Sequence, residues 1–116
     1  MYTGLIVFLG TDDLDATDLF YRKDLGLSIY KQQPTCTIYQ VTEQSAIGFC
    51  SHLPKVREKK NPILTLLVED VQKTYKELQK KGVRTHTSPT INSTFQIEHF
   101  FLEDNNGYTV EIQSFL

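Results

Sequence analysis

Apolar and polar residues follow one pattern that occurs twice along the chain. Two helix-length stretches, 13–26 and 70–82, each begin at an Asp that can cap a helix and end at a Gly that suits the position just after one. Each stretch carries an apolar stripe at helical spacing. The stripe consists of Val71, Tyr75 and Leu78 in the second stretch and, less regularly, of Ala16, Leu19 and Phe20 in the first.

Each predicted helix follows an apolar run and precedes three segments rich in β-formers, with turn residues such as those at 42–45 and 104–107 between them. The chain therefore reads as a β-α-β-β-β unit used twice, at about 1–53 and 62–116, within one α+β domain. Segment 54–61 is polar and flanked by prolines, and we predict a linker there. Charge runs of this kind are usually solvated, so its lysines are given no chemistry.

Several predicted strands are apolar almost without interruption, including GLIVFLG, ILTLLV and HFFL. A strand with one wet face would alternate, so both faces of these strands should be covered. A helix of the same unit can cover one face. The other face needs the second unit, a partner subunit or a concave ligand cavity, and the sequence leaves these alternatives open.

Charge and composition exclude several classes of protein. The net charge of −2 gives no basic field for nucleic acid. The apolar stretch Leu5–Leu9 lacks the length and the basic lead-in of a signal peptide or membrane span, so we expect a cytoplasmic protein with no membrane partner. Cys36 and Cys50 are too few for a disulfide framework, and we expect free thiols in a reducing compartment.

Three segments, DDLDATDLFYRKDLGL, VEDVQKTYKELQKKGV and FFLEDNNGYTVEI, resemble the signatures of the vicinal oxygen chelate superfamily of glyoxalases, bleomycin-resistance proteins and extradiol dioxygenases. The resemblance covers nearly the whole chain. It implies two modules that form a curled mixed sheet with a concave cavity. It also implies a divalent metal held by a His or Gln on the first strand, a Glu near the end of the first module, a His opening the second module and a Glu on the last strand.

The positions that the resemblance assigns to the metal carry few donors. They fall on Ile6, Phe49, Ile63 and Glu111, of which Glu111 alone can bind a metal, whereas sites of this type need about three protein ligands. We therefore expect no metal at the usual place and no other cofactor.

Period-two alternation from these positions predicts which side chains face the cavity. The predicted ligand-binding residues are Ile6, Phe8, Thr37, Tyr39, Ile47, Phe49, Ile63, Thr65, His99, Phe101, Thr109, Glu111 and Gln113. The residues predicted to pack under the helices are Leu5, Val7, Leu64, Leu66, Val110 and Ile112, together with Cys36 and Cys50. His52 and His86 are predicted to lie at the surface.

The sequence is compatible with three kinds of function. The favoured hypothesis is a homodimer that binds a small hydrophobic or aromatic molecule without a metal, as metal-free bleomycin-resistance proteins bind their drug. The alternative is a metal-dependent lyase, isomerase or dioxygenase with a shifted site around Glu111 and His99. These two side chains can accept or donate a proton, or they can form a buried hydrogen-bonded pair with no catalytic role. A module kept only for interaction or regulation is a third possibility.

Overall fold

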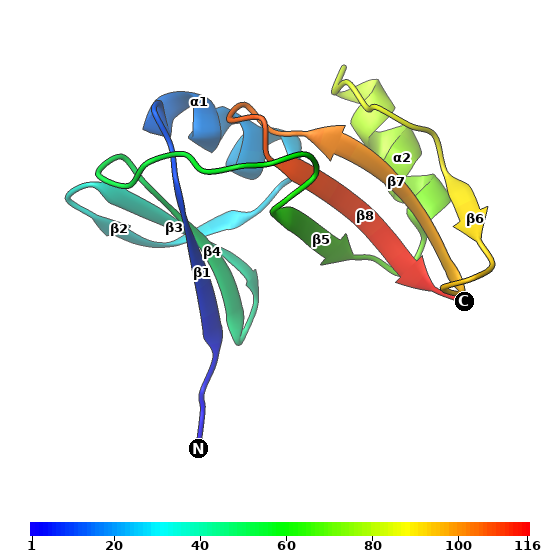
Figure 1. Ribbon diagram of the computed structural model, residues 1–116, viewed down its shortest axis with the longest axis horizontal. Coiled ribbons are helices and arrows are strands. Elements are labelled where there is room, and N and C mark those ends of the chain that lie inside the picture. Colours follow the sequence, from blue (N-terminus) through cyan, green and yellow to red (C-terminus); the bar gives the residue numbers. More distant parts are fainter. The chain divides into compact units, whose positions relative to one another are not determined.

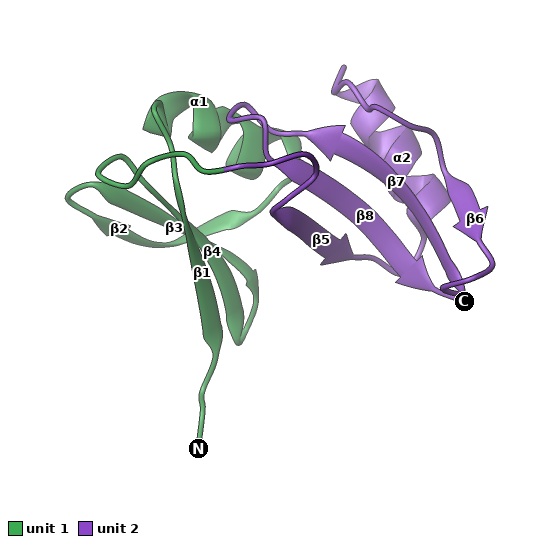
Figure 2. Cartoon of the chain, viewed as in Figure 1, with its two compact units in different colours: residues 1–56 green, residues 57–116 purple.

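The computed structural model describes residues 1–116. They form two compact units, Met1–Val56 and Arg57–Leu116, which divide inside the predicted linker (Figure 2). Each unit has the predicted β-α-β-β-β order and its own four-stranded mixed sheet, so the α+β class is confirmed.

The first unit contains strands β1 (Leu5–Gly10), β2 (Ser28–Gln33), β3 (Cys36–Thr42) and β4 (Ser45–Cys50), in the order β1-β4-β3-β2 (Figure 1). Strand β1 runs parallel to β4, and the other neighbours are antiparallel. The parallel pair forms because the helical segment between β1 and β2 carries the chain across the sheet.

The helical segment of the first unit is α1 (Leu14–Asp18), which continues as a π-helical turn, η1 (Leu19–Asp24). Asp13 caps it by accepting from the backbone N–H of Ala16 at 2.9 Å, as the sequence predicts. The wider turn buries Phe20 and Tyr21 and leaves Leu19 exposed, while Thr17 is buried in α1. The predicted stripe is therefore wrong at Leu19, because it assumed regular α-helical spacing.

The second unit contains β5 (Ile63–Leu67), α2 (Val71–Lys80), β6 (Thr90–Asn92), β7 (Ile97–Glu103) and β8 (Thr109–Phe115), with sheet order β5-β8-β7-β6. Asp70 caps α2 by accepting from the N–H of Lys73 at 3.0 Å. Gly82 follows the helix with a φ of 77°, the left-handed conformation predicted for that glycine.

One face of the second sheet packs against α2, which lies beside β7 in Figure 1. The ring of Tyr75 meets that of Phe100 edge to face, with centroids 5.2 Å apart. Of the residues predicted to lie on this face, Leu64, Val110 and Ile112 are buried and Leu66 is half-buried. Phe100 and Leu102 are buried on the same face. The opposite face carries the polar positions considered below.

The first unit has an aromatic core on the helix side of its sheet. Tyr21 of η1 stacks against Phe49 with centroids 4.6 Å apart, and Tyr39 packs beside them. All three side chains are completely or almost completely buried. Since Thr37 pairs with Phe49 and Tyr39 with Ile47, these four residues share that face. Their predicted placement in the cavity is wrong.

A difference between the two turns explains this error. In the first unit Thr42 pairs with Ser45 across the turn, whereas in the second unit Glu103 pairs with Thr109, so equal offsets from the two turns do not reach equivalent positions. A shift of one residue moves every side chain to the other face of a strand. The prediction counted from the turn and therefore placed the wrong set of residues inward.

The same shift moves the cysteines. Cys36 pairs with Cys50 across β3 and β4, on the face away from the helix and beside Ile38 and Gly48. The two form a disulfide, with Cα atoms 4.1 Å apart. The predictions of free thiols and of packing under the helix are therefore wrong in this structure.

Strand β1 lies at the edge of its sheet and is poorly covered. Leu5 and Val7, predicted to pack under the helix, are exposed, and so are Ile6 and Phe8 on the other face. No helix of the chain has the length and apolar character needed to cross a membrane.

Candidate functional site

A carboxylate sits at the centre of the sheet face that points away from α2 in the second unit. Glu111 is only 8% exposed and accepts three side-chain hydrogen bonds. Thr65 Oγ1 donates to Oε1 at 2.7 Å, while His99 Nδ1 and Gln113 Nε2 donate to Oε2 at 2.6 and 3.2 Å. The carboxylate is thus held in one orientation.

The hydrogen bonds decide the charge of Glu111. Burial tends to raise the pKa of this carboxyl, but the hydrogen bonds from Thr65, His99 and Gln113 outweigh burial and hold its pKa below its ordinary value. Glu111 is therefore ionised at neutral pH.

Strand register brings these residues together. Glu111 on β8 lies opposite Thr65 on β5 and Phe101 on β7, and His99 lies opposite Gln113. Ile63 and Thr109 pair on the same face. The seven positions predicted in this unit therefore share one face of the sheet: Ile63, Thr65, His99, Phe101, Thr109, Glu111 and Gln113. The hollow described next is lined by two of them, Phe101 and Thr109.

A hollow of about 260 Å³ adjoins this face. Phe101 and Thr109 line it, and the Nζ of Lys60 lies 4.5 Å from the centroid of the Phe101 ring. The other lining residues come from the chain before β5 and from the loop after α2 and its neighbours: Arg57, Lys59, His86, Thr87, Leu102 and Glu103. His86 and Glu103 form an ion pair at 3.2 Å.

The lining cations are the part of this region that the sequence did not assign. Arg57 and Lys60 lie in the segment predicted to be a solvated linker, and they are exposed, as expected. Their place beside Phe101 depends on how the chain folds back before β5. The basic residues clustered at 55–60 are the feature of the sequence that indicates a positively charged surface there.

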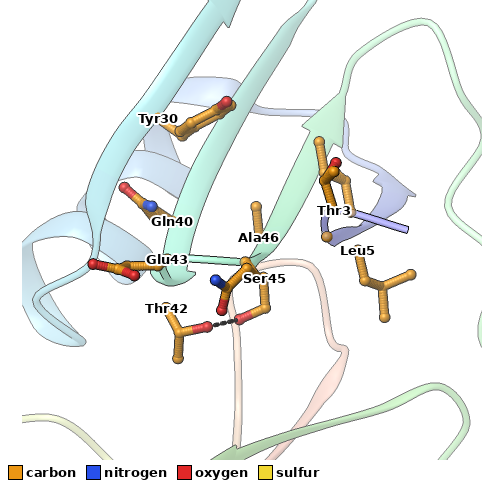
Figure 3. Close-up of a pocket in the computed structure, with 11 residues that line it drawn as sticks. Thr3, Leu5, Tyr30, Gln40, Thr42, Glu43, Ser45 and Ala46 are labelled. Atoms are coloured by element: carbon orange, nitrogen blue, oxygen red, sulfur yellow. Dashed lines mark hydrogen bonds between the residues drawn. The ribbon is translucent and has the colours of Figure 1, made fainter. Parts of the chain in front are cut away.

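A second hollow, of about 240 Å³, lies in the first unit (Figure 3). Tyr30, Gln40 and Glu43 contribute polar groups, and Thr42 and Ser45 form a hydrogen bond at its rim, 2.6 Å between hydroxyl oxygens. Ile6 is the one predicted ligand-binding residue that lines it.

The first unit has no counterpart of Glu111. Phe8 pairs with Gly48 as Thr65 pairs with Glu111, so the position equivalent to Glu111 is Gly48 and the predicted Phe49 is wrong by one residue. A Cβ at Gly48 would lie 2.6 Å from a carbon of the Phe8 ring. The Phe8 ring therefore fills the place where the second unit has a carboxylate.

Tyr39 contributes a buried hydrogen bond instead of a cavity group. Its hydroxyl donates to Asp18 Oδ1 at 3.0 Å. Burial raises the pKa of this hydroxyl, and the bond to Asp18 adds to the effect. Arg22 pairs with the same carboxyl and lowers the pKa of Asp18. These contacts join the helical segment to the sheet.

The family model of the Glyoxalase/Bleomycin resistance protein/Dioxygenase superfamily matches residues 5–112. The chain belongs to this superfamily. No curated protein matches the sequence.

Solved structures of the superfamily have the same fold. A glyoxalase/bleomycin resistance protein/dioxygenase from Nocardioides has a TM-score of 0.79 at 15% identity, covering 100% of this chain and 85% of its own. A glyoxalase/bleomycin resistance protein from Catenulispora acidiphila has 0.75 at 17%, covering 97% and 98%. A lactoylglutathione lyase from Agrobacterium tumefaciens has 0.76 at 15%, covering 95% and 91%. At such identities the likeness concerns the fold alone.

The residues at the usual metal positions of the superfamily do not fit a divalent ion. Ile6, Gly48 and Ile63 carry no donor atom in their side chains. Both oxygens of Glu111 already accept hydrogen bonds. A single carboxylate does not supply the three protein ligands of a typical catalytic site.

Proposed function

We propose that this protein binds a small organic molecule with an aromatic or apolar part and an acidic group, in the hollow of the second unit and without a metal ion. The observation that carries the proposal is the Phe101 ring, which lines a hollow of about 260 Å³ together with Thr109. An aromatic ring of a ligand can stack there, which gives contact area at little entropic cost.

The charges around the hollow favour an anion. Arg57, Lys59 and Lys60 line it, and the one lining carboxylate, Glu103, is paired with His86. Exposed ion pairs each stabilise by no more than about 1 kcal/mol. The cations would therefore orient an acidic group, while the contact with Phe101 supplies most of the affinity.

The Glu111 network supports the binding surface. Glu111 fixes the His99 ring, whose centroid lies 5.1 Å from that of Phe101 in an edge-to-face contact. Phe101 is thereby packed on its own strand face before any ligand arrives. Such preorganisation lowers the entropic cost of binding.

Replacing Phe101 by alanine tests the proposal. Benzoate and larger aromatic carboxylates, titrated by ligand-observed NMR in a chelator, should bind the variant about tenfold more weakly, since a central aromatic contact contributes at least 1–2 kcal/mol. Phe95→Ala is the matched control, because Phe95 is exposed in the same unit and lies outside the hollow. Equal binding by wild type and Phe101→Ala would rule out this site.

A second candidate function is acid–base catalysis by His99. Its Nδ1 is 2.6 Å from Glu111, which fixes the ring and leaves Nε2 to act on a substrate. Lactoylglutathione is the first compound to test, given the fold shared with a lyase of that name. Conversion by wild type that His99→Gln abolishes would favour an enzyme, and absence of conversion with and without divalent metals would favour binding.

We also propose that the chain forms a homodimer through its edge strands. Strand β1 exposes apolar side chains on both faces, and Ile63 and Leu67 are exposed on β5, the edge of the other sheet. Exposed apolar edges are normally paired or covered. A cytoplasmic location is part of the same proposal.

A charge on β1 tests the dimer. Val7→Lys places an ammonium group on the exposed edge, so sedimentation velocity should show a dimer for wild type and a monomer for the variant. The matched control is Val56→Lys, since Val56 is exposed but lies outside every strand. A wild-type monomer at all concentrations would refute the dimer.

A further inference from the structure

Three side chains with metal-binding atoms meet at one end of the β3–β4 hairpin in the first unit. Cys36 and Cys50 lie directly opposite each other and are almost fully buried, while His52, two residues further on, is exposed. The two Sγ atoms and a ring nitrogen of His52 lie within 4.8 Å of one another. None of these residues takes part in the proposed ligand site.

We propose that, once the disulfide is reduced, Cys36, Cys50 and His52 bind one zinc ion, so that the chain alternates between a disulfide form and a metal form. Two thiolates and an imidazole match the preference of zinc for sulfur and nitrogen ligands. The site differs from the usual metal position of the superfamily in every residue.

Distances support three-ligand binding. Nδ1 of His52 lies 4.0 Å from Sγ of Cys36. Tetrahedral zinc with zinc–sulfur bonds of about 2.3 Å separates its sulfur ligands by about 3.8 Å, so the two Sγ atoms move apart from their bonded positions when the disulfide is reduced and zinc binds. The fourth position, on the exposed side at His52, is left for water.

Thr35 positions the imidazole. Its Oγ1 lies 2.7 Å from Nδ1 of His52 and keeps the ring turned toward the cysteines. Zinc at Nδ1 displaces this hydroxyl contact, so Thr35 holds the ring near the cysteines in the disulfide form only.

The disulfide form becomes the metal form in two steps, thiol–disulfide exchange and then zinc binding. A dithiol gives two electrons and two protons to the Cys36–Cys50 bond, which breaks into two thiols, while the dithiol closes to its own disulfide. Zinc then displaces the two thiol protons into solvent and binds both thiolates. Reducing conditions favour the metal form and oxidising conditions the disulfide form.

The experiment uses the full chain, reduced with dithiothreitol and desalted without oxygen. Zinc is titrated against a chromophoric chelator, and cobalt is added separately to detect thiolate-to-cobalt charge-transfer absorption. We expect one equivalent of either ion in the reduced protein, none in the oxidised protein, and protection of both thiols from alkylation by zinc.

Variants separate this site from adventitious binding. His52→Ala should lower the zinc affinity by about 100-fold, since losing even an outer-shell partner costs about 10–100-fold. His86→Ala, which removes another exposed histidine, should change nothing. His52 is at the surface, so its variant keeps the fold; the double variant Cys36→Ser, Cys50→Ser should lose the cobalt absorption entirely.

Two results would overturn the proposal. One is a reduced wild-type protein that fails to compete with the chelator and shows no charge-transfer absorption. The other is zinc binding that survives both His52→Ala and the double serine variant, since the ion would then lie elsewhere.

Discussion

Replacing Phe49 by alanine should lower the free energy of unfolding by about 3–5 kcal/mol, the usual cost of deleting a fully buried phenylalanine. The ring is 0% exposed and packs against Tyr21 and, edge to face, against Tyr39. This loss is a large share of the stability of a typical domain, about 5–15 kcal/mol. Urea unfolding followed by circular dichroism measures it.

The control for that prediction is Phe8→Ala. Phe8 is 45% exposed and lies on the opposite face of the sheet, over Gly48. Its loss should cost about 1–2 kcal/mol, in proportion to the apolar area it buries. Equal losses for Phe8 and Phe49 would contradict the assignment of the two faces.

Glu111→Gln should have the second-largest effect on stability, about 2–3 kcal/mol at neutral pH. The substitution keeps the size of the side chain but replaces one carboxylate oxygen by an NH₂ group that cannot accept a bond. Hydrogen bonds to a charged group each contribute about 1.5–3 kcal/mol, and a donor left unpaired adds a cost. Glu77→Gln, on the exposed side of α2, is the control and should change little.

The effect of Glu111→Gln on the free energy of unfolding depends on pH, because burial tends to raise the pKa of Glu111 but hydrogen bonds hold it below its ordinary value. A carboxyl with a depressed pKa in the folded state stabilises the protein above its unfolded pKa, about 4.3 for glutamate, and loses that contribution as the pH falls through the folded pKa. The difference in the free energy of unfolding between wild type and Glu111→Gln should therefore become smaller in acid. A difference that stays constant from pH 7 to below the folded pKa would contradict an ionised Glu111 held by hydrogen bonds.

Local signals in the sequence predicted the elements well. Asp13 and Asp70 cap the helical segments, and Gly26 and Gly82 follow them with positive φ, because caps depend on residues within one turn. The Glu111 face was also predictable, since β7 and β8 pair without interruption and alternation then fixes each side chain.

The first unit could not be predicted in the same way. The two hairpin turns differ in length, so a count from the turn is one residue out in the first unit and reverses which residues face the helix. The disulfide depends on the same register, because Cys36 and Cys50 meet only when they lie opposite each other. The hollow beside Phe101 was missed because its cations come from an irregular segment without periodicity.

The measurement that tests the central claim most directly is a titration of the isotope-labelled wild-type chain with benzoate and larger aromatic carboxylates, in a chelator, followed by amide NMR shifts. We predict saturable shifts around Lys60, Phe101 and Thr109 that are the same with and without the chelator. Shifts that gather instead around Tyr30 and Gln40, or binding that requires a divalent metal, would contradict the account.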